Sequence, residues 1–315
     1  MSDTLPDTLP PVAPQPEAVR HQLRRLAHRG EIAWLSEEVA RRLGAKLDMI
    51  KLTPAHWVHW NAMLGGGETI VEARYPEARR WVVEPTPALA QRSLERERAA
   101  APRAWWAPWR RHEPSVAVAG AALSGAWPEG GAQMLWANMT LHASTDLAEM
   151  LGQWSRLLAV DGYLMSSGLG PDTAKELRAV YATMGWPLPT VDFIDMHDLG
   201  DALVAAGFAD PVMDMERLTL TWASAEELLT ELRSWGGNVA RGRFAGLRTP
   251  RWKRRLLEAL STHLMRPDGR LGLTIELVYG HAMKPVPRVK VEAETRLSMD
   301  DMRQMIRQGG KPGPR

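Results

Sequence analysis

The sequence predicts an α/β fold in which a mainly parallel sheet is covered by helices on both faces. Two observations carry this prediction. Short apolar segments alternate with helical segments through the first two thirds of the chain, and two long alternating segments, 212–222 and 271–281, stand in the last third. Parallel neighbours need a crossover connection, which these helices supply. The last two strands are able to form an antiparallel pair at the end of the sheet.

The first strand, turn, helix and second strand are read from residues 57–84. An apolar run (57–63) leads into Gly65, Gly66 and Gly67, a helix (68–75) stops at Pro76, and a short strand (80–83) ends on Glu84. In doubly wound α/β domains such glycines let the backbone approach a ligand, and an acid after the second strand accepts hydrogen bonds from ribose hydroxyls. A plain turn is the competing interpretation of the glycines.

The other elements follow in order along the chain. Helical segments at about 17–49 come before the first strand. The remaining predicted strands are 116–119, 134–137 and 163–166, and the remaining predicted helices are 88–100, 147–158, 173–184, 198–206, 225–235 and 249–264. Four parts of the chain are therefore predicted: a disordered proline-rich lead-in (1–16), an N-terminal helical cap (17–50), the α/β domain (51–284) with a helical insertion at about 223–268, and a flexible basic tail (285–315).

Composition restricts the class of protein. With 315 residues, 45% of them hydrophobic, the chain can bury a sizeable core. It has no cysteine, which excludes a disulfide scaffold and thiolate chemistry, and its 14 tryptophans are expected to pack in the core. No signal peptide and no stretch of about 20 apolar residues is found, so a cytoplasmic protein without membrane association is predicted. The histidines form no metal-binding motif, and no metal site is predicted.

Basic side chains are unevenly distributed although the net charge is only +2. We expect one group of them to dock an acidic partner, since complementary charge speeds encounter. A solvated helix face is the alternative, and nucleic acid is an improbable partner because no recognised module is present. This predicted docking group consists of Arg248, Arg251, Lys253, Arg254 and Arg255.

Three strings carry a family resemblance: SGLGPDTAKELR (167–178), FIDMHDLGDALVAAGFADPVMDMERLTLTW (193–222) and TIELVYGHAMKP (274–285). They resemble the malonyl-acyl-carrier-protein O-methyltransferases of biotin synthesis and the related mitochondrial complex I assembly factors. The resemblance implies a Rossmann-like, seven-stranded class I methyltransferase sheet. It also implies S-adenosylmethionine as methyl donor, and the free carboxylate of a malonyl thioester on an acyl carrier protein as acceptor. Such a carboxylate is ionised at neutral pH and needs no general base, so no catalytic residue is assigned.

The resemblance implies a cofactor site made by Gly65, Gly66, Gly67, Glu84 and Asn138. Two registers of the glycine motif are open. When Arg74-Tyr75-Pro76 is placed on the family's equivalent string, Gly65 becomes the last motif glycine. In that register His59 replaces the motif's aspartate, Asn61 and Met63 replace its first two glycines, and the Met63 side chain should obstruct the cofactor. The other register uses Gly65 and Gly67 directly.

Four residues are candidates for the acceptor site. Tyr279 and His281 lie two apart on a predicted strand and so share a face. They either line the acceptor pocket or anchor the strand through buried hydrogen bonds. Arg178 and Arg29 are cations that could pair with a carboxylate, and a surface role is the alternative for each.

Two functions follow from these patterns. One is an active methyltransferase, and the other is a non-catalytic methyltransferase-fold protein that binds or assembles partners after partial loss of its cofactor motif. Whether the chain is an enzyme is thus uncertain at this level, and the sequence leaves its oligomeric state open.

Overall fold

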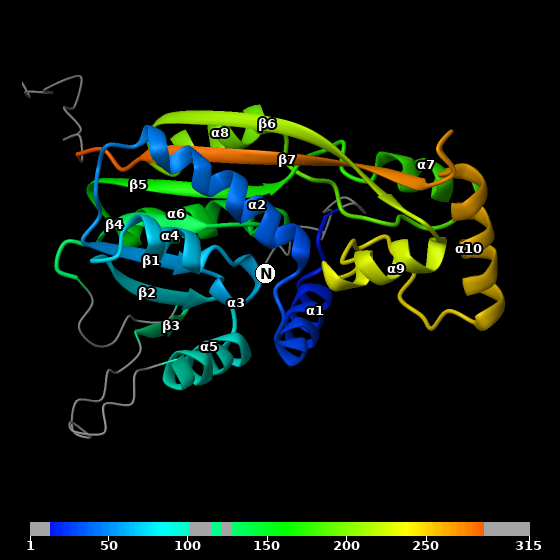
Figure 1. Cartoon of the computed structure of the whole chain (residues 1–315), viewed down its shortest axis with the longest axis horizontal. Helices are drawn as coiled ribbons and strands as arrows, with labels where there is room; N and C mark the ends of the chain where they lie inside the picture. Colours follow the sequence, from blue (N-terminus) through cyan, green and yellow to red (C-terminus); the bar gives the residue numbers. More distant parts are fainter. Residues whose placement is uncertain (1–12, 101–114, 121–127, 287–315) are drawn as a thin grey trace, which may run out of the picture. The chain divides into compact units, whose positions relative to one another are not determined.

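The computed structural model describes residues 13–100, 115–120 and 128–286. Most of the predicted lead-in (1–16) and of the predicted tail (285–315) lies outside these ranges. The described chain forms one seven-stranded sheet in the order β3-β2-β1-β4-β5-β7-β6 (Figure 1). The strands are β1 (His56–Trp60), β2 (Arg79–Glu84), β3 (Val116–Val118), β4 (Ala132–Ala137), β5 (Leu158–Leu169), β6 (Ala209–Trp222) and β7 (Leu271–Met283).

The described helices fall before and between these strands in the alternation that the sequence predicts. They are α1 (Pro16–Arg29), α2 (Trp34–Ala45), α3 (Ala62–Gly65), α4 (Glu68–Arg74), α5 (Pro87–Ala100), α6 (Leu147–Leu157), α7 (Lys175–Thr183), α8 (Met196–Ala205), α9 (Ala225–Ser234) and α10 (Pro250–His263), with the 3-10 turns η1 (Lys46–Met49) and η2 (Leu141–Ala143). None of the described helices is both long enough and apolar enough to cross a membrane.

Strand directions confirm the predicted sheet. β1 pairs in parallel with β2 and β4, β2 with β3, and β4 with β5. β7 is inserted between β5 and β6 and runs antiparallel to both. This seven-stranded arrangement, with one antiparallel strand next to the edge, is the class I methyltransferase sheet that the resemblance implies.

Alternate residues of the strands build a core on each face of the sheet. Trp57 points to the face covered by α2 and α4, where it packs in one apolar cluster. Val58, the next residue, points to the face covered by α6 and α8 and belongs to a second cluster. Figure 1 shows α2 and α4 on the face turned to the viewer. This period of two is what a strand buried on both faces produces.

A third apolar cluster lies at the far ends of β6 and β7, where α7, α9 and α10 pack around Trp222 and Leu271. The helices α9 and α10 belong to the connection between these two strands. Core packing is confirmed for the described tryptophans that lie in strands or in α6, since all six are buried, whereas Trp34 at the start of α2 is 55% exposed; the six are Trp57, Trp60, Trp81, Trp136, Trp154 and Trp222.

Two strands differ from their predicted limits for physical reasons. β5 runs from Leu158 to Leu169, longer than the predicted 163–166, and β7 pairs with it from Tyr163 through Leu169. β1 ends at Trp60 instead of Met63, because Asn61 adopts a left-handed conformation with φ of 55° and starts a turn. Asparagine tolerates this conformation better than most residues do.

Candidate functional site

The carboxyl ends of β1, β2 and β4 meet at one edge of the sheet, where ligands bind in open α/β folds. The turn at Asn61 follows β1, Glu84 ends β2, and Asn138 follows β4. The turn at Asn61 supports the register in which Asn61 and Met63 occupy the first two glycine positions of the motif.

Glu84 is fully buried, and one of its two carboxyl oxygens is already engaged. Its Oε1 accepts hydrogen bonds from the backbone N–H of Met63 at 2.9 Å and from the Ser93 hydroxyl at 2.6 Å. Its Oε2 is buried without a hydrogen-bond partner among the described residues. Burial raises the pKa of Glu84 to about 7, against the opposing effect of these two hydrogen bonds.

The side chain of Met63 is buried beside this acid. It packs in an apolar cluster with Ala27 of α1 and Leu89 of α5. The helical cap and α5 therefore both contact the residue that the first register places at a glycine position of the motif. A methionine there fills space that glycine would leave open.

The glycine triplet packs against β4. A Cβ on Gly65 would lie 2.6 Å from the backbone oxygen of Asn138, and a Cβ on Gly67 would lie 2.7 Å from the ring of Trp136. Gly67 also has a φ of 90°, a left-handed conformation that favours glycine. The close approach that requires glycine at these two positions is thus to the protein itself.

His59 of β1 also holds the glycine turn, through the backbone of Gly66. Its Nε2 lies 3.0 Å from the backbone oxygen of Gly66, which also accepts a hydrogen bond from Trp136 Nε1 at 3.0 Å. Burial, with a further contribution from Arg80, lowers the pKa of His59 to about 3, so the ring is neutral. Because a carbonyl only accepts, Nε2 carries the proton. The residue that replaces the motif's aspartate thus holds the glycine turn.

Both the nitrogen and the oxygen of the Asn138 side-chain amide form hydrogen bonds with other residues of the protein. Its Nδ2 donates to the backbone oxygens of Ser36 and Gly65, at 2.8 and 2.5 Å, and its Oδ1 accepts from the Ser167 hydroxyl at 2.6 Å. The side chain thereby joins α2, the glycine turn and β5. The structure brings Asn138, Gly65 and Glu84 to one edge of the sheet, as the sequence predicts.

A cavity of about 210 Å³ opens beside this turn. Its wall is formed by α1, α2, the residues after β1 and β4, the end of β5 and the 234–239 segment after α9. It reaches the glycine turn at Asn61 and Leu64 and the end of β4 at Met139. Glu84, Met63 and the three glycines are not part of the wall. The acid is thus separated from the cavity by the turn that covers it.

The cavity wall is mainly apolar and carries few charges. No lysine or arginine lines it, and Glu31, which is exposed, is its charged residue. Four of its lining residues each bury one polar side-chain atom that has no hydrogen-bond partner in the described ranges. These atoms are Gln22 Oε1, Asn61 Oδ1, His142 Nδ1 and Thr190 Oγ1.

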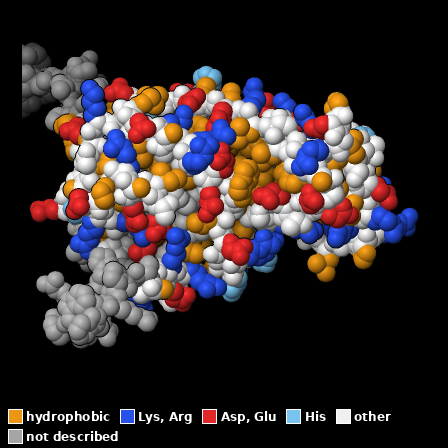
Figure 2. Space-filling view, viewed as in Figure 1, with side chains coloured by type: hydrophobic (Ala, Val, Ile, Leu, Met, Phe, Trp, Pro, Cys, Tyr) orange, Lys and Arg blue, Asp and Glu red, His pale blue; other side chains and the backbone are white. Residues whose placement is uncertain are grey.

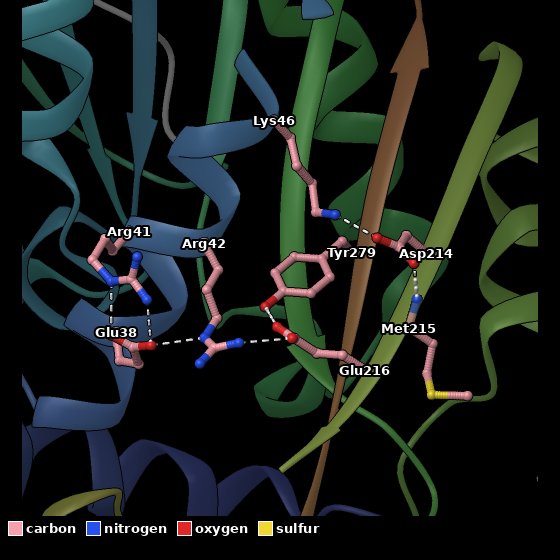
Figure 3. Close-up of polar contacts among 8 residues, drawn as sticks. All are labelled: Glu38, Arg41, Arg42, Lys46, Asp214, Met215, Glu216 and Tyr279. Atoms are coloured by element: carbon pink, nitrogen blue, oxygen red, sulfur yellow. Dashed lines mark hydrogen bonds and ion pairs between the residues drawn. The ribbon is translucent and has the colours of Figure 1, made fainter. Parts of the chain in front are cut away.

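Tyr279 and His281 lie outside the cavity wall. The Tyr279 hydroxyl donates to Glu216 of β6, which also pairs with Arg42 of α2 at 2.7 Å (Figure 3). The His281 Nδ1 is 3.1 Å from the backbone oxygen of Leu164. These contacts favour the anchoring interpretation of both residues, since they join β7 to its neighbours and to α2.

The same network ties the cap helix to the edge of the sheet. Glu38 of α2 binds Arg41 and Arg42, and Lys46 binds Asp214 of β6 (Figure 3). The hydrogen bond from Arg41 to Glu38 holds the pKa of the Glu38 carboxyl well below its ordinary value, at about 2. The network is structural, because its side chains pair with each other.

The two candidate acceptor arginines bind backbone oxygens. Arg178 donates to Thr173 and Pro171 in the turn before α7, and Arg29 donates to Arg233 at the end of α9 at 2.8 Å. Neither lines the cavity. Arg178 is half-buried, while Arg29 is exposed and links α1 to α9.

The predicted docking group lies on and before α10. Arg251, Lys253, Arg254 and Arg255 are exposed, and none of the four forms an ion pair with a described residue. Arg248 stacks on the Phe244 ring, with 3.7 Å from its guanidinium carbon to the ring centre. At the end of the molecule where α9 and α10 lie, Figure 2 shows basic side chains mixed with acidic and apolar ones. Across the described ranges, no cluster of three acidic or histidine side chains is placed to hold a metal ion.

Sequence reasoning missed His142 and Thr190. His142 lies in η2, four residues after Asn138, and Thr190 lies in a loop. Neither position belongs to a recognisable motif. Only the spacing from the end of β4 could have indicated His142, because residues just after such strands border the ligand edge.

Comparison with known proteins gives strong relatives over nearly the whole chain. A malonyl-[acyl-carrier protein] O-methyltransferase of Laribacter hongkongensis is 36% identical over 281 residues, covering 87% of this chain and 89% of that protein. Proteins of the same name from Gallionella capsiferriformans and Halorhodospira halophila are 36% and 34% identical, with 82% and 88% of this chain covered and 86% and 91% of theirs. No family model matches the chain. Among solved structures, the YcgJ protein of Bacillus subtilis aligns with a TM-score of 0.48 and 11% sequence identity. The alignment covers 78% of this chain and 99% of that protein. This likeness is too weak to bear on function.

Proposed function

The chain belongs to the malonyl-[acyl-carrier protein] O-methyltransferase family, and we propose that it methylates the free carboxylate of a carrier-bound malonyl thioester. The observation that carries this proposal is the cavity beside the ends of β1 and β4. It lies at the edge of the sheet where open α/β folds bind ligands. Its size suits a short acyl group rather than a protein side chain presented on a large surface.

The cavity is suited to a reaction that depends on position. Methyl transfer is an in-line displacement, and an ionised carboxylate attacks without a general base. The protein's contribution is to align the acceptor and to remove water from it. Apolar walls supplied by Leu35, Leu169 and Leu177, with the cap helices on one side, meet this need.

S-Adenosylmethionine is the donor that we propose, and its sulfonium supplies the methyl group. Two buried oxygens without partners fit it: Asn61 Oδ1, in the wall of the cavity, and Glu84 Oε2, at the position of the ribose-binding acid. We propose that Asn61 binds the amino-acid end of the cofactor, because its unpaired Oδ1 belongs to a residue of the cavity wall. Glu84 meets the ribose only after Met63 moves, because the turn separates this acid from the cavity.

An acidic acyl carrier protein is the partner that we propose, docking on α10. The connection between β6 and β7 carries both this basic helix and the 234–239 segment of the cavity wall. The helix α10 packs on α7 and α9, which contribute Leu177 and Leu232 to the cavity wall, so a carrier bound at α10 lies one helix away from that wall. Complementary charge would steer that encounter.

A second function is favoured by a specific observation, the engagement of Glu84 by Met63 and Ser93. A protein that has filled its ribose position could retain the acceptor cavity and lose methyl transfer. It would then bind a carrier-borne acyl group without modifying it.

A transfer assay separates the two functions. Purified protein is incubated with malonyl-acyl carrier protein and S-adenosylmethionine, and intact-protein mass spectrometry looks for the mass of one methyl ester. Acetyl-acyl carrier protein, which lacks the free carboxylate, is the control and should gain no mass. Ester formation supports the first function. No ester, together with no cofactor binding at millimolar concentration, rejects it and leaves the second.

A further inference from the structure

We propose that His142, in the wall of the cavity, is the residue that recognises the carboxylate of the acceptor, through an imidazole N–H. This inference rests on the proposed function and deepens it, since it names a specificity-determining group. The family resemblance did not indicate this residue.

The position of His142 is fixed by the residues around it. It stands in η2, directly after the turn that follows β4. Its ring packs edge-on against Phe193 with 6.3 Å between the ring centres and 70° between the planes. Both residues line the cavity. The imidazole is therefore held in one orientation at the wall.

The hydrogen-bonding capacity of this ring is unused within the described protein. Its Nδ1 is buried and has no hydrogen-bond partner there. A buried polar atom without a partner costs free energy, and most such atoms in folded proteins are satisfied by a ligand, a water molecule or another residue. A ligand group that enters the cavity can provide the partner, and burial keeps the ring neutral by lowering its pKa to about 4.

The cavity wall has no cationic side chain to pair with a carboxylate, so a neutral hydrogen-bond donor has to bind it. A carboxylate brought into an apolar cavity needs compensating hydrogen bonds, and no lysine or arginine of the wall provides them. Of the wall's unpaired groups, the His142 ring and the Thr190 hydroxyl are those that can turn a hydrogen toward an oxygen. Glu31 is exposed and would repel a carboxylate. The carboxylate is therefore directed inward, toward His142.

A neutral donor also suits the chemistry. A guanidinium would pair with the carboxylate strongly and hold its electrons. A neutral N–H holds the group in place while its charge stays available for attack on a methyl group. The ring thus combines recognition with preserved nucleophilicity.

Binding measurements without cofactor test this inference. Titration calorimetry compares malonyl-pantetheine with acetyl-pantetheine, which lacks the carboxylate, on wild-type protein, His142→Phe and His142→Gln. We expect wild-type protein to bind the malonyl compound at least tenfold more tightly. His142→Phe should bind the two compounds equally, and His142→Gln, which keeps an N–H, should keep part of the preference. His197→Phe, at an exposed histidine outside the cavity, is the control and should behave as wild type.

The outcomes distinguish this inference from the proposed function. If His142→Phe is folded by circular dichroism and retains the full preference, the inference is wrong even where wild-type protein forms the methyl ester. If wild-type protein shows no preference for the malonyl compound, the inference is also wrong, and the transfer assay decides the proposed function separately. Loss of the preference in His142→Phe with rescue in His142→Gln supports it.

Discussion

The backbone N–H of Met63 donates a hydrogen bond to Oε1 of Glu84 at 2.9 Å, across the turn that joins β1 to α3. The residue that the resemblance places at a motif glycine position thus binds the acid that we propose for the cofactor ribose. The Met63 side chain is buried in a cluster with Ala27 and Leu89, while its backbone N–H holds the carboxyl. If Glu84 holds the cofactor ribose, the cofactor must displace Met63 to reach it.

Replacing Met63 with glycine should open the ribose position. We expect the affinity for S-adenosylhomocysteine to rise at least tenfold in Met63→Gly, because the side chain that fills the space is removed. The loss of a buried side chain should cost roughly 2 to 5 kcal/mol of stability. Calorimetric titration measures the first effect and urea denaturation the second.

Met63→Leu is the matched control, since it keeps the bulk and should bind as wild type does. Met63→Ala serves if the glycine variant does not fold. An unchanged affinity in folded Met63→Gly and Met63→Ala would show that the side chain does not limit cofactor binding.

Glu84→Gln should change how stability depends on pH. The pKa of Glu84 is raised from its ordinary value near 4.5 to about 7, so its proton is held more tightly in the folded state. Below pH 4.5 the acid is protonated in both states. As pH rises to 7 only the unfolded chain readily ionises, and wild-type protein loses stability over that window.

Glutamine keeps an oxygen for Met63 and Ser93 but does not ionise. The stability advantage of Glu84→Gln should therefore grow by roughly 1 to 3 kcal/mol between pH 4.5 and pH 7 and then level off. Urea denaturation at pH 5 and pH 8 gives this difference. A constant difference at both values would contradict a raised pKa at Glu84.

Gly67→Ala should destabilise the fold more than Gly30→Ala. Both glycines have a positive φ, 90° and 69°, so each substitution carries backbone strain of about 1 kcal/mol. The new methyl at position 67 would also stand 2.7 Å from the fully buried Trp136 ring, whereas at position 30 nothing lies within 4 Å. Overpacking adds about 1 to 3 kcal/mol. Thermal denaturation of the two variants compares them directly, and equal losses would mean that the Trp136 contact relaxes freely.

Reversing one charge on α10 should slow association with an acidic carrier protein. Arg254→Glu is expected to lower the association rate roughly three- to tenfold at low ionic strength, with a smaller effect at high salt because exposed charges are screened. Arg98→Glu, at an exposed arginine of α5, is the control. Stopped-flow measurement at two salt concentrations reads the rates. The docking proposal fails if the two variants are slowed alike.

Much of the fold could be predicted because its signals are local. The alternation of strand and helix, the stop at Pro76 and the two long alternating segments each depend on neighbouring residues. The carboxyl end of β5 could not be predicted, because its last residues, 167–169, pair with β7, which lies more than a hundred residues away in the sequence. The end of β1 at Asn61 follows from a backbone conformation that several residue types can avoid.

The position of the candidate site could be predicted from the sequence, but the contacts that its residues make could not. The sequence located the glycine turn, Glu84 and Asn138 at one edge of the sheet, since strand ends and motif spacing are properties of the chain. It did not show that Trp136 and Asn138 require the small residues, nor that Tyr279 and His281 bind neighbouring strands. These are contacts between distant segments.

The sequence by itself determined the family, the α/β class and the edge of the sheet where ligands bind, because periodicity and motif order are written along the chain. Only the tertiary structure decided that the backbone of Met63 binds Glu84 and that His142 lines a cavity with no lysine or arginine in its wall. Burial, hydrogen-bond partners and the shape of a cavity arise when segments far apart in sequence pack together. A residue's identity states what it can bind, and its neighbours in space decide what it does bind.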